Sequence, residues 1–322
     1  MKFAEMAAGA ALICAPLSAQ AELKKFNVAV TDRQGGPVTG LQSSDFRLLE
    51  DGKPQTIAFF RFTDDQPIQA NQHSQVVSRG VCSNRTAAPP HYTVVLIDLL
   101  NDRLTGGMAI GEEVARLLRD VKPSKSLYIY FLTPSGSLYP LHPMPNPNTA
   151  PTQVEAEWTQ DLARTVQSAL KTLITFKQVN DRNLKARFNL TVHALQEIGT
   201  RMELIPGRKN LVWATRGFPR YVYFSTSDDD MVDFAEPFRV ICEFLKNQQI
   251  VVYPVEESPQ GPASMDGARA QTLDDFWMLT GGRKFGSGGV GEAVRQATAD
   301  SSANYEIAYY SSSGEKHDGK YH

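Results

Sequence analysis

The stretch YTVVLIDLLND, residues 92–102, decides the fold class of this chain. It is an apolar run that ends on Asp98 and keeps a second acid at Asp102. A continuous apolar run of this length is typical of a strand that is buried on both faces of a parallel sheet. Because ligands of open parallel sheets bind beyond the carboxyl ends of the strands, Asp98 is the first candidate for a functional residue.

Strands and helices alternate after this run, as they do in proteins with a parallel sheet. Apolar runs predict further strands at residues 126–133, 136–144, 208–215, 249–256 and 304–311. Apolar residues at helical spacing predict helices at residues 110–121, 158–173, 184–202, 234–245, 272–282 and 291–300. We therefore expect a doubly wound α/β domain over residues 92–311, with a mostly parallel sheet and helices on both faces.

The segment before this domain has a different pattern. Residues 22–63 contain short alternating runs between turn-rich stretches, and Asp51-Gly52 is a strong hairpin signal. They predict a small β-strand region, which must pack on another part of the chain because a sheet of three or four strands is thin. Residues 64–91 are polar and contain prolines, so we expect an extended linker there.

The N-terminus has the features of an export signal. Residues 1–21 contain a lysine, an apolar stretch and the small residues Ala19 and Ala21, which predict a signal peptide cleaved after Ala21. An uncleaved anchor or a wrongly assigned start is the alternative. No later stretch resembles a transmembrane span. We expect an exported protein of the periplasm, the cell envelope or the extracellular space.

Composition and cysteine usage limit the possible partners. The chain has 322 residues and a formal net charge of -2, so no basic surface for nucleic acid is expected. Cys82 lies in the linker, and Cys242 reads as a buried position of a helix. An exported protein can oxidise its thiols, so a Cys82–Cys242 disulfide is the alternative to two free cysteines.

The sheet topology predicts where a binding site lies. In the common strand order 3-2-1-4-5-6, the strand at residues 92–98 borders the strand at residues 208–215 where the order reverses. The loops that follow these strands read DLLND, which ends at Asp102, and TRGFP, which begins at Thr215. We expect these loops to form a crevice, and the aromatic stretch GFPRYVYF, residues 217–224, lies next to it.

Common enzyme patterns do not fit this crevice. A phosphatase of the haloacid dehalogenase type needs a second acid where Leu100 stands. The chain has no Gly-x-Ser-x-Gly motif, and its six histidines are scattered without ligand spacing. The segment GSGGVG, residues 286–291, fits the dinucleotide pattern but lacks the acidic partner of a dinucleotide site, so we interpret it as a Gly-rich turn. These patterns predict no catalytic residue.

Taken over most of its length, the chain resembles a known family. The matching segments are VTDRQGGPVTGLQSSDFRLLEDGKPQTIAFF, CSNRTAAPP, TVVLIDLLND, LIPGRKNLVWATRGFP, IVVYPVE, LTGGRKF and YEIAYYSSSGEKHDGKYH. They resemble von Willebrand factor A (VWA) domain proteins, and more narrowly the VWFA-related proteins of acidobacteria. The resemblance implies a VWA-like, Rossmann-like α/β domain with a binding or adhesion function. Members of the family usually continue past DGKYH, so we expect residues 312–322 to be a truncated C-terminal tail.

The resemblance also implies a site. VWA domains hold a divalent cation such as Mg²⁺ at a metal-ion-dependent adhesion site. Its Asp-x-Ser-x-Ser loop corresponds to Asp98, Leu100 and Asp102, its threonine falls near Asn189, and Arg216 replaces its last aspartate. Leu100 offers no oxygen ligand, and Arg216 brings a permanent cation. We expect a degenerate site without a cofactor, in which Arg216 pairs with Asp98 or Asp102. Weak cation binding by Asp98 and Asp102 is the alternative.

The sequence as a whole favours a protein-binding module that is not an enzyme. We expect an unidentified protein partner to meet a rim formed by Asp98, Asn101, Asp102, Asn189, Arg216, Phe218 and Tyr221. The alternative for the aromatic residues is that their loop folds onto its own domain. The alternatives for the whole protein are a hydrolase that uses Asp98 or Asp102, and a passive structural domain of the envelope.

Overall fold

The structure is a computed structural model that describes residues 22–33, 36–64, 92–101, 121, 126–144, 184–203, 205, 208–218, 221–223, 231–256, 263–286 and 289–311. The predicted signal peptide, residues 65–91 of the linker, the helix expected at residues 158–173, most of the one expected at 110–121 and the C-terminal tail lie outside the described residues.

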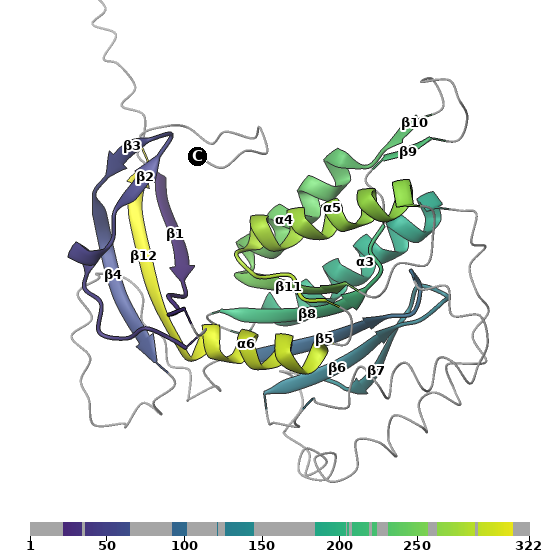
Figure 1. Cartoon of the computed structure of the whole chain (residues 1–322), viewed down its shortest axis with the longest axis horizontal. Coiled ribbons are helices and arrows are strands. Elements are labelled where there is room, and N and C mark those ends of the chain that lie inside the picture. The colour runs from purple at the N-terminus through teal and green to yellow at the C-terminus, as the bar shows by residue number, and fades with distance from the viewer. Residues whose placement is uncertain are drawn as a thin grey trace, which may run out of the picture.

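The described elements follow one another in the order shown in Figure 1. Their bounds are β1 Glu22–Val28, η1 Ser43–Asp45, β2 Leu48–Glu50, β3 Lys53–Gln55, β4 Ile57–Asp64, β5 Tyr92–Asp98, β6 Leu127–Leu132, β7 Leu138–His142, α3 Leu184–Glu203, β8 Lys209–Thr215, β9 Tyr221–Tyr223, β10 Met231–Asp233, α4 Ala235–Asn247, β11 Ile250–Glu256, α5 Ala263–Thr280, α6 Val290–Ser302 and β12 Ala303–Ser311.

A five-stranded, mostly parallel sheet forms the centre of the α/β part. Its order is β11-β8-β5-β6-β7, and all its neighbours are parallel except β6 and β7. The turn between β6 and β7 is tight, with the Gly136 amide donating to the Thr133 carbonyl at 2.8 Å. So short a connection can only reverse the chain, which makes β7 antiparallel. The predicted fold class is confirmed, as is the prediction that β5 borders β8 at the reversal of strand order.

Helices cover both faces of this sheet (Figure 1). Val94 and Trp213 lie on the face that packs against α3, α4 and α5. Val95 and Val212 point to the opposite face, where α6 packs. All residues of β5 and β8 are buried, which explains why their sequences read as continuous apolar runs rather than as alternating ones.

The last strand belongs to the small β region and not to the α/β domain. β12 is the middle strand of a three-stranded antiparallel sheet with the order β1-β12-β4. The expected division into residues 22–63 and 92–311 therefore does not match this pairing. The physical reason is that β12 follows α6 directly and pairs with every residue of β1, from Glu22 opposite Ser311 to Val28 opposite Tyr305. Its apolar run predicted a buried strand but not which sheet buries it.

An aromatic cluster holds the small sheet together. The ring of Tyr305 lies 5.2 Å from Phe46, 5.6 Å from Phe60 and 5.0 Å from Phe62, measured between centroids. Its hydroxyl donates to the Val38 carbonyl at 3.0 Å. Aromatic contacts at such distances add to the free energy gained by burying the rings, so they supply the packing that this thin sheet needs.

The hairpin predicted at Asp51-Gly52 is confirmed. β2 and β3 pair in antiparallel register with Glu50 opposite Lys53. Asp51 and Gly52 both have positive φ, at 50° and 75°, as a two-residue type I′ turn requires.

Candidate functional site

Asp98 is the last residue of β5 and the first residue of the candidate site. Its side chain is only 3% exposed. Oδ1 accepts the backbone amides of Leu100 at 3.1 Å and Asn101 at 2.9 Å. The carboxylate thus takes the place of a backbone carbonyl in the turn that leaves the sheet, which is a common role of aspartate at such turns.

The second oxygen of Asp98 is bound by two side chains. Oδ2 accepts the Asn101 side-chain amide at 2.8 Å and the Thr215 hydroxyl at 2.7 Å. Thr215 is the last residue of β8, and its hydroxyl in turn accepts the Gly217 amide at 2.9 Å. The two loops predicted to meet at the switch point therefore do meet. With two donors on each oxygen, the hydrogen-bonding capacity of the carboxylate is satisfied from within the protein.

Asn101 links this carboxylate to helix α3. Its amide nitrogen also donates to the Thr191 hydroxyl at 2.8 Å, and that hydroxyl donates to the Arg187 carbonyl at 2.9 Å. Arg187 Nη2 donates to Asn101 Oδ1 at 3.4 Å. The orientation of the amide is fixed because its nitrogen faces two acceptors and its oxygen faces a cation. The amide nitrogen therefore lies between the oxygens of Asp98 and Thr191.

A divalent cation does not fit this arrangement. Mg²⁺ needs oxygen ligands with free lone pairs, whereas the Asp98 oxygens accept from protein donors and a nitrogen donor occupies the space toward Thr191. The Leu100 side chain is buried in the hydrophobic core, as expected of a residue without a ligand atom. Among the described residues, no group of three or more His, Cys, Asp or Glu side chains is placed to hold a metal ion.

Arg187 is a cation that acts on Asp98. Burial raises the pKa of Asp98, and the hydrogen bonds from Asn101 and Thr215 and the positive charge of Arg187 oppose this shift. The sequence suggested that Arg216 pairs with Asp98 or Asp102, and Asp102 lies outside the described residues, so this pairing stays a prediction. The Asp98 carboxylate accepts hydrogen bonds from Leu100, Asn101 and Thr215. Arg216 follows β8 and is half-buried.

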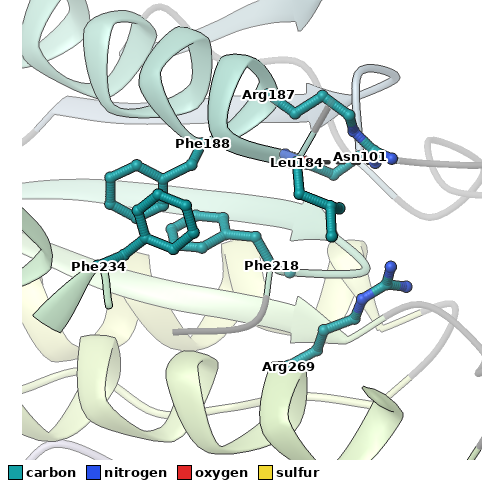
Figure 2. Close-up of a pocket in the computed structure, with 8 residues that line it drawn as sticks. Asn101, Leu184, Arg187, Phe188, Phe218, Phe234 and Arg269 are labelled. Carbon is teal, nitrogen blue, oxygen red and sulfur yellow. Dashed lines mark hydrogen bonds between the residues drawn. The ribbon is translucent and has the colours of Figure 1, made fainter. Parts of the chain in front are cut away.

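A small hollow opens beside Asn101, and Figure 2 shows it. Its lining is formed by Asn101, Leu184, Arg187, Phe188, Gly217, Phe218, Phe234 and Arg269. In Figure 2 the aromatic rings gather on one side, while Arg187 reaches from α3 toward Asn101 and Arg269 reaches from α5 toward the same end. Its volume is about 10 Å³, room for roughly one water molecule.

Phe218 does not lie on an exposed rim. It is 4% exposed, and its ring packs edge-on against Phe188 with centroids 4.9 Å apart. The turn that directs it inward depends on Gly217, where φ is +67° and an added Cβ would lie 3.2 Å from the Arg269 carbonyl oxygen. For this residue the alternative expectation holds, in which the loop folds onto its own domain.

Of the other residues expected at the rim, Asn101 and Asn189 differ in exposure. Asn101 is 1% exposed and lies at the centre of the network, while Asn189 points to solvent from α3. The backbone of Tyr221 forms part of β9, but its side chain and the whole of Asp102 lie outside the described residues.

Four polar residues of the site were missed from the sequence, and three of them come from helices. Thr191 and Arg187 lie one turn apart on α3, and Arg269 lies on α5. Thr191 is two positions from Asn189, within the range expected from the VWA resemblance. Thr215 stands in the loop motif TRG and could have been found from its place at the end of a strand next to β5.

Comparison with known proteins identifies no family for this chain. No protein-family model matches the chain, and no curated protein matches it. Among solved structures, the human COPII-coat protein Sec24c matches with a TM-score of 0.33 and 12% sequence identity, covering 64% of this chain and 30% of the Sec24c chain. At this level of similarity the match carries no argument.

Among the described helices, none combines the length and apolar character that crossing a membrane requires.

Proposed function

We propose that this protein is an exported, VWA-like binding module that meets a protein partner at the carboxyl end of its sheet. The main support for the proposal is that hydrogen-bond donors of the protein itself occupy both oxygens of the Asp98 carboxylate. Its carboxylate accepts from Leu100, Asn101 and Thr215, so it organises the two loops instead of facing a ligand. Arg216 and Arg269, which flank or line the hollow, are more exposed than Asp98 and are the positive groups that we expect a partner to meet.

The charge at this end of the sheet favours a partner with acidic groups. Arg187 and Arg269 line the hollow, and Arg216 stands directly before Gly217 in the loop that closes it. Guanidinium groups bind carboxylates through paired hydrogen bonds and are frequent anchors of protein interfaces. Arg216 and Arg269 are half-buried, which leaves part of each side chain open to a partner.

A binding role agrees better with this geometry than an enzymatic one. A catalytic acid, base or nucleophile must reach the substrate, but the Asp98 side chain is 3% exposed and its oxygens are engaged by the protein. The VWA resemblance of the sequence supports the same conclusion, with the arginines acting at the place where such domains use a cation. The predicted signal peptide supports export to the periplasm, the envelope or the extracellular space.

The test is capture of partners from an envelope extract by the immobilised mature protein. Arg216→Gln and Arg269→Gln are the test variants, and Arg201→Gln is the matched control, because Arg201 is exposed and pairs with Glu197 on α3. We expect the same proteins to be captured in EDTA and in Mg²⁺, lost with both test variants and kept with the control. Loss of capture in EDTA would instead favour a metal site, and equal capture by all variants would exclude the arginine rim.

A hydrolase screen of the purified protein tests the enzymatic alternative. Turnover of any ester, phosphate or peptide substrate that disappears in Asp98→Asn would contradict the binding proposal. Since Asp98 is bound on both oxygens, we expect no such turnover.

A further inference from the structure

A second hollow lies far from Asp98, at the amino end of the parallel sheet. It is bounded by the last residues of α3 and α4, the first residue of β8 and a residue of β1. The lining residues are Lys25, Glu203, Ile205, Lys209, Lys246, Asn247, Gln248 and Gln249. In Figure 1 this is the side of the α/β part that faces β1 of the small sheet.

The size of this hollow suits a small molecule. Its volume is about 410 Å³, within the range of roughly 300–1,000 Å³ that is usual for small-molecule pockets. The lining is mostly polar, with three ammonium groups against one carboxylate and with three side-chain amides. Ammonium and amide N–H groups are hydrogen-bond donors, so together they fit a ligand rich in negatively charged oxygens.

Lys209 is the most deeply placed of the three lysines. It is 3% exposed, and its ammonium donates to the Ile205 carbonyl at 2.9 Å. Burial lowers the pKa of Lys209 to about 8, and the charge of Glu203 opposes this shift. A buried ammonium that lines a pocket gains more from an anion than an exposed lysine does, because water screens the interaction less.

Strained backbone also marks this pocket. Gln249 has a φ of 57°, in the left-handed region where a helix end usually carries Gly or Asn. A side chain is strained in this conformation because its Cβ comes close to the following carbonyl oxygen. Its carbonyl accepts the Lys209 amide at 3.0 Å, so the strained residue and the buried lysine are directly linked. Residues in strained backbone conformations cluster at active sites and ligand-binding sites.

The attraction of cations to the carboxyl ends of helices explains two of the three lysines but not the third. Lys209 and Lys246 lie near the last turns of α3 and α4, where cations are favoured by exposed carbonyls. Lys25 comes from β1 in the other sheet, forms an ion pair with Glu306 and still lines the hollow. The pocket therefore gathers cations from two separate parts of the protein.

We propose that this pocket binds a small anion with two or more carboxylate or phosphate groups. Lys209 and Lys246 hold it from the α/β domain, and Lys25 holds it from the small sheet. The anion thereby joins the two sheets, and its binding is independent of the arginine rim at the opposite end.

Titration calorimetry at pH 7 and constant ionic strength tests this proposal with citrate and with pyrophosphate as probes. The two probes distinguish a carboxylate site from a phosphate site. We expect one of them to bind with a Kd below 1 mM, on the order of magnitude of weak specific ligands. Absence of binding by both probes would overturn the proposal.

Variants locate the binding. Lys246→Gln changes an exposed side chain and Lys209→Met a buried one, and we expect each to raise the Kd about tenfold or more. Lys185→Gln removes an exposed lysine at the start of α3, outside the pocket, and should leave the Kd unchanged. If Lys209→Met does not fold, Lys246→Gln decides. Equal weakening by Lys185→Gln would mean attraction by net charge only and would refute a defined site.

Discussion

Replacing Asn101 by alanine should break the network that links the two loops to α3. The side chain donates to Asp98 and to Thr191 at 2.8 Å each and accepts from Arg187 at 3.4 Å. A hydrogen bond to a charged group contributes about 1.5–3 kcal/mol and one between neutral groups about 1 kcal/mol. The adjoining hollow can admit about one water molecule, which would recover part of the loss. We expect a loss of about 2–4 kcal/mol in the free energy of unfolding.

Urea denaturation of the protein at 25 °C measures this loss. The matched control is Asn189→Ala, because Asn189 is exposed on α3 and alanine is at least as good a helix former there. The control should stay within about 0.5 kcal/mol of the wild type, as exposed substitutions usually do. A double-mutant cycle with Thr191→Val should give a coupling of about 1 kcal/mol, since the two side chains are in contact.

Two results would refute this reasoning. If Asn101→Ala cost no more than Asn189→Ala, the network would not contribute to stability. If the protein with Asn101 intact gained stability from Mg²⁺ at the same site, the amide would not occupy the cation position. The first result concerns the energetics of the hydrogen bonds and the second concerns the place of the amide, so the two can be told apart.

Three further predictions follow from the same structure. Asn101→Asp puts a second carboxylate beside Asp98 and Thr191. We expect the variant protein to unfold at a lower temperature than the wild type in EDTA and to regain part of this loss in Mn²⁺, whereas Mn²⁺ should not stabilise the wild type. Burial lowers the pKa of His142 to about 4, so on acidification from pH 6.5 to 4 the unfolded state takes up a proton before the folded state does, and the free energy of unfolding should fall by about 2 kcal/mol. His142→Phe should flatten this pH dependence, whereas His193→Gln, at an exposed position, should not change it. Burial raises the pKa of the Cys242 thiol. In a variant of residues 22–322 with Cys82→Ser, the Cys242 thiol should therefore react with a thiol reagent only after the protein unfolds. Rapid reaction in the native protein would contradict the burial of Cys242.

The sheet and one half of the site could be predicted from the sequence. The apolar run of β5 indicated a doubly buried strand, and the usual strand order of such folds placed its end beside that of β8. These two inferences brought Asp98 next to the TRG loop. The VWA resemblance added a threonine near Asn189, and Thr191 lies two residues further along the helix.

The other half depended on packing that periodicity does not encode. Which turn of α3 faces Asn101 is set by how the helix lies on the sheet, so neither Arg187 nor Thr191 could be assigned from spacing alone. The inward turn of Phe218 depends on a positive φ at Gly217, which a sequence permits but does not require. β12 was assigned to the wrong sheet because the apolar character of a strand does not determine which strands it pairs with.

The position of β12 between β1 and β4 also limits the order in which the protein can assemble. Glu22 pairs with Ser311, so the small sheet joins residues from nearly the whole length of the described chain. Pairings so distant in sequence form slowly, because the chain loses the entropy of closing a long loop before the strand contacts contribute favourable free energy. The α/β part can fold earlier, since its sheet strands lie between Tyr92 and Glu256. Any truncation before Ala303 would take away the middle strand and leave β1 and β4 as unpaired edges, which are prone to aggregate.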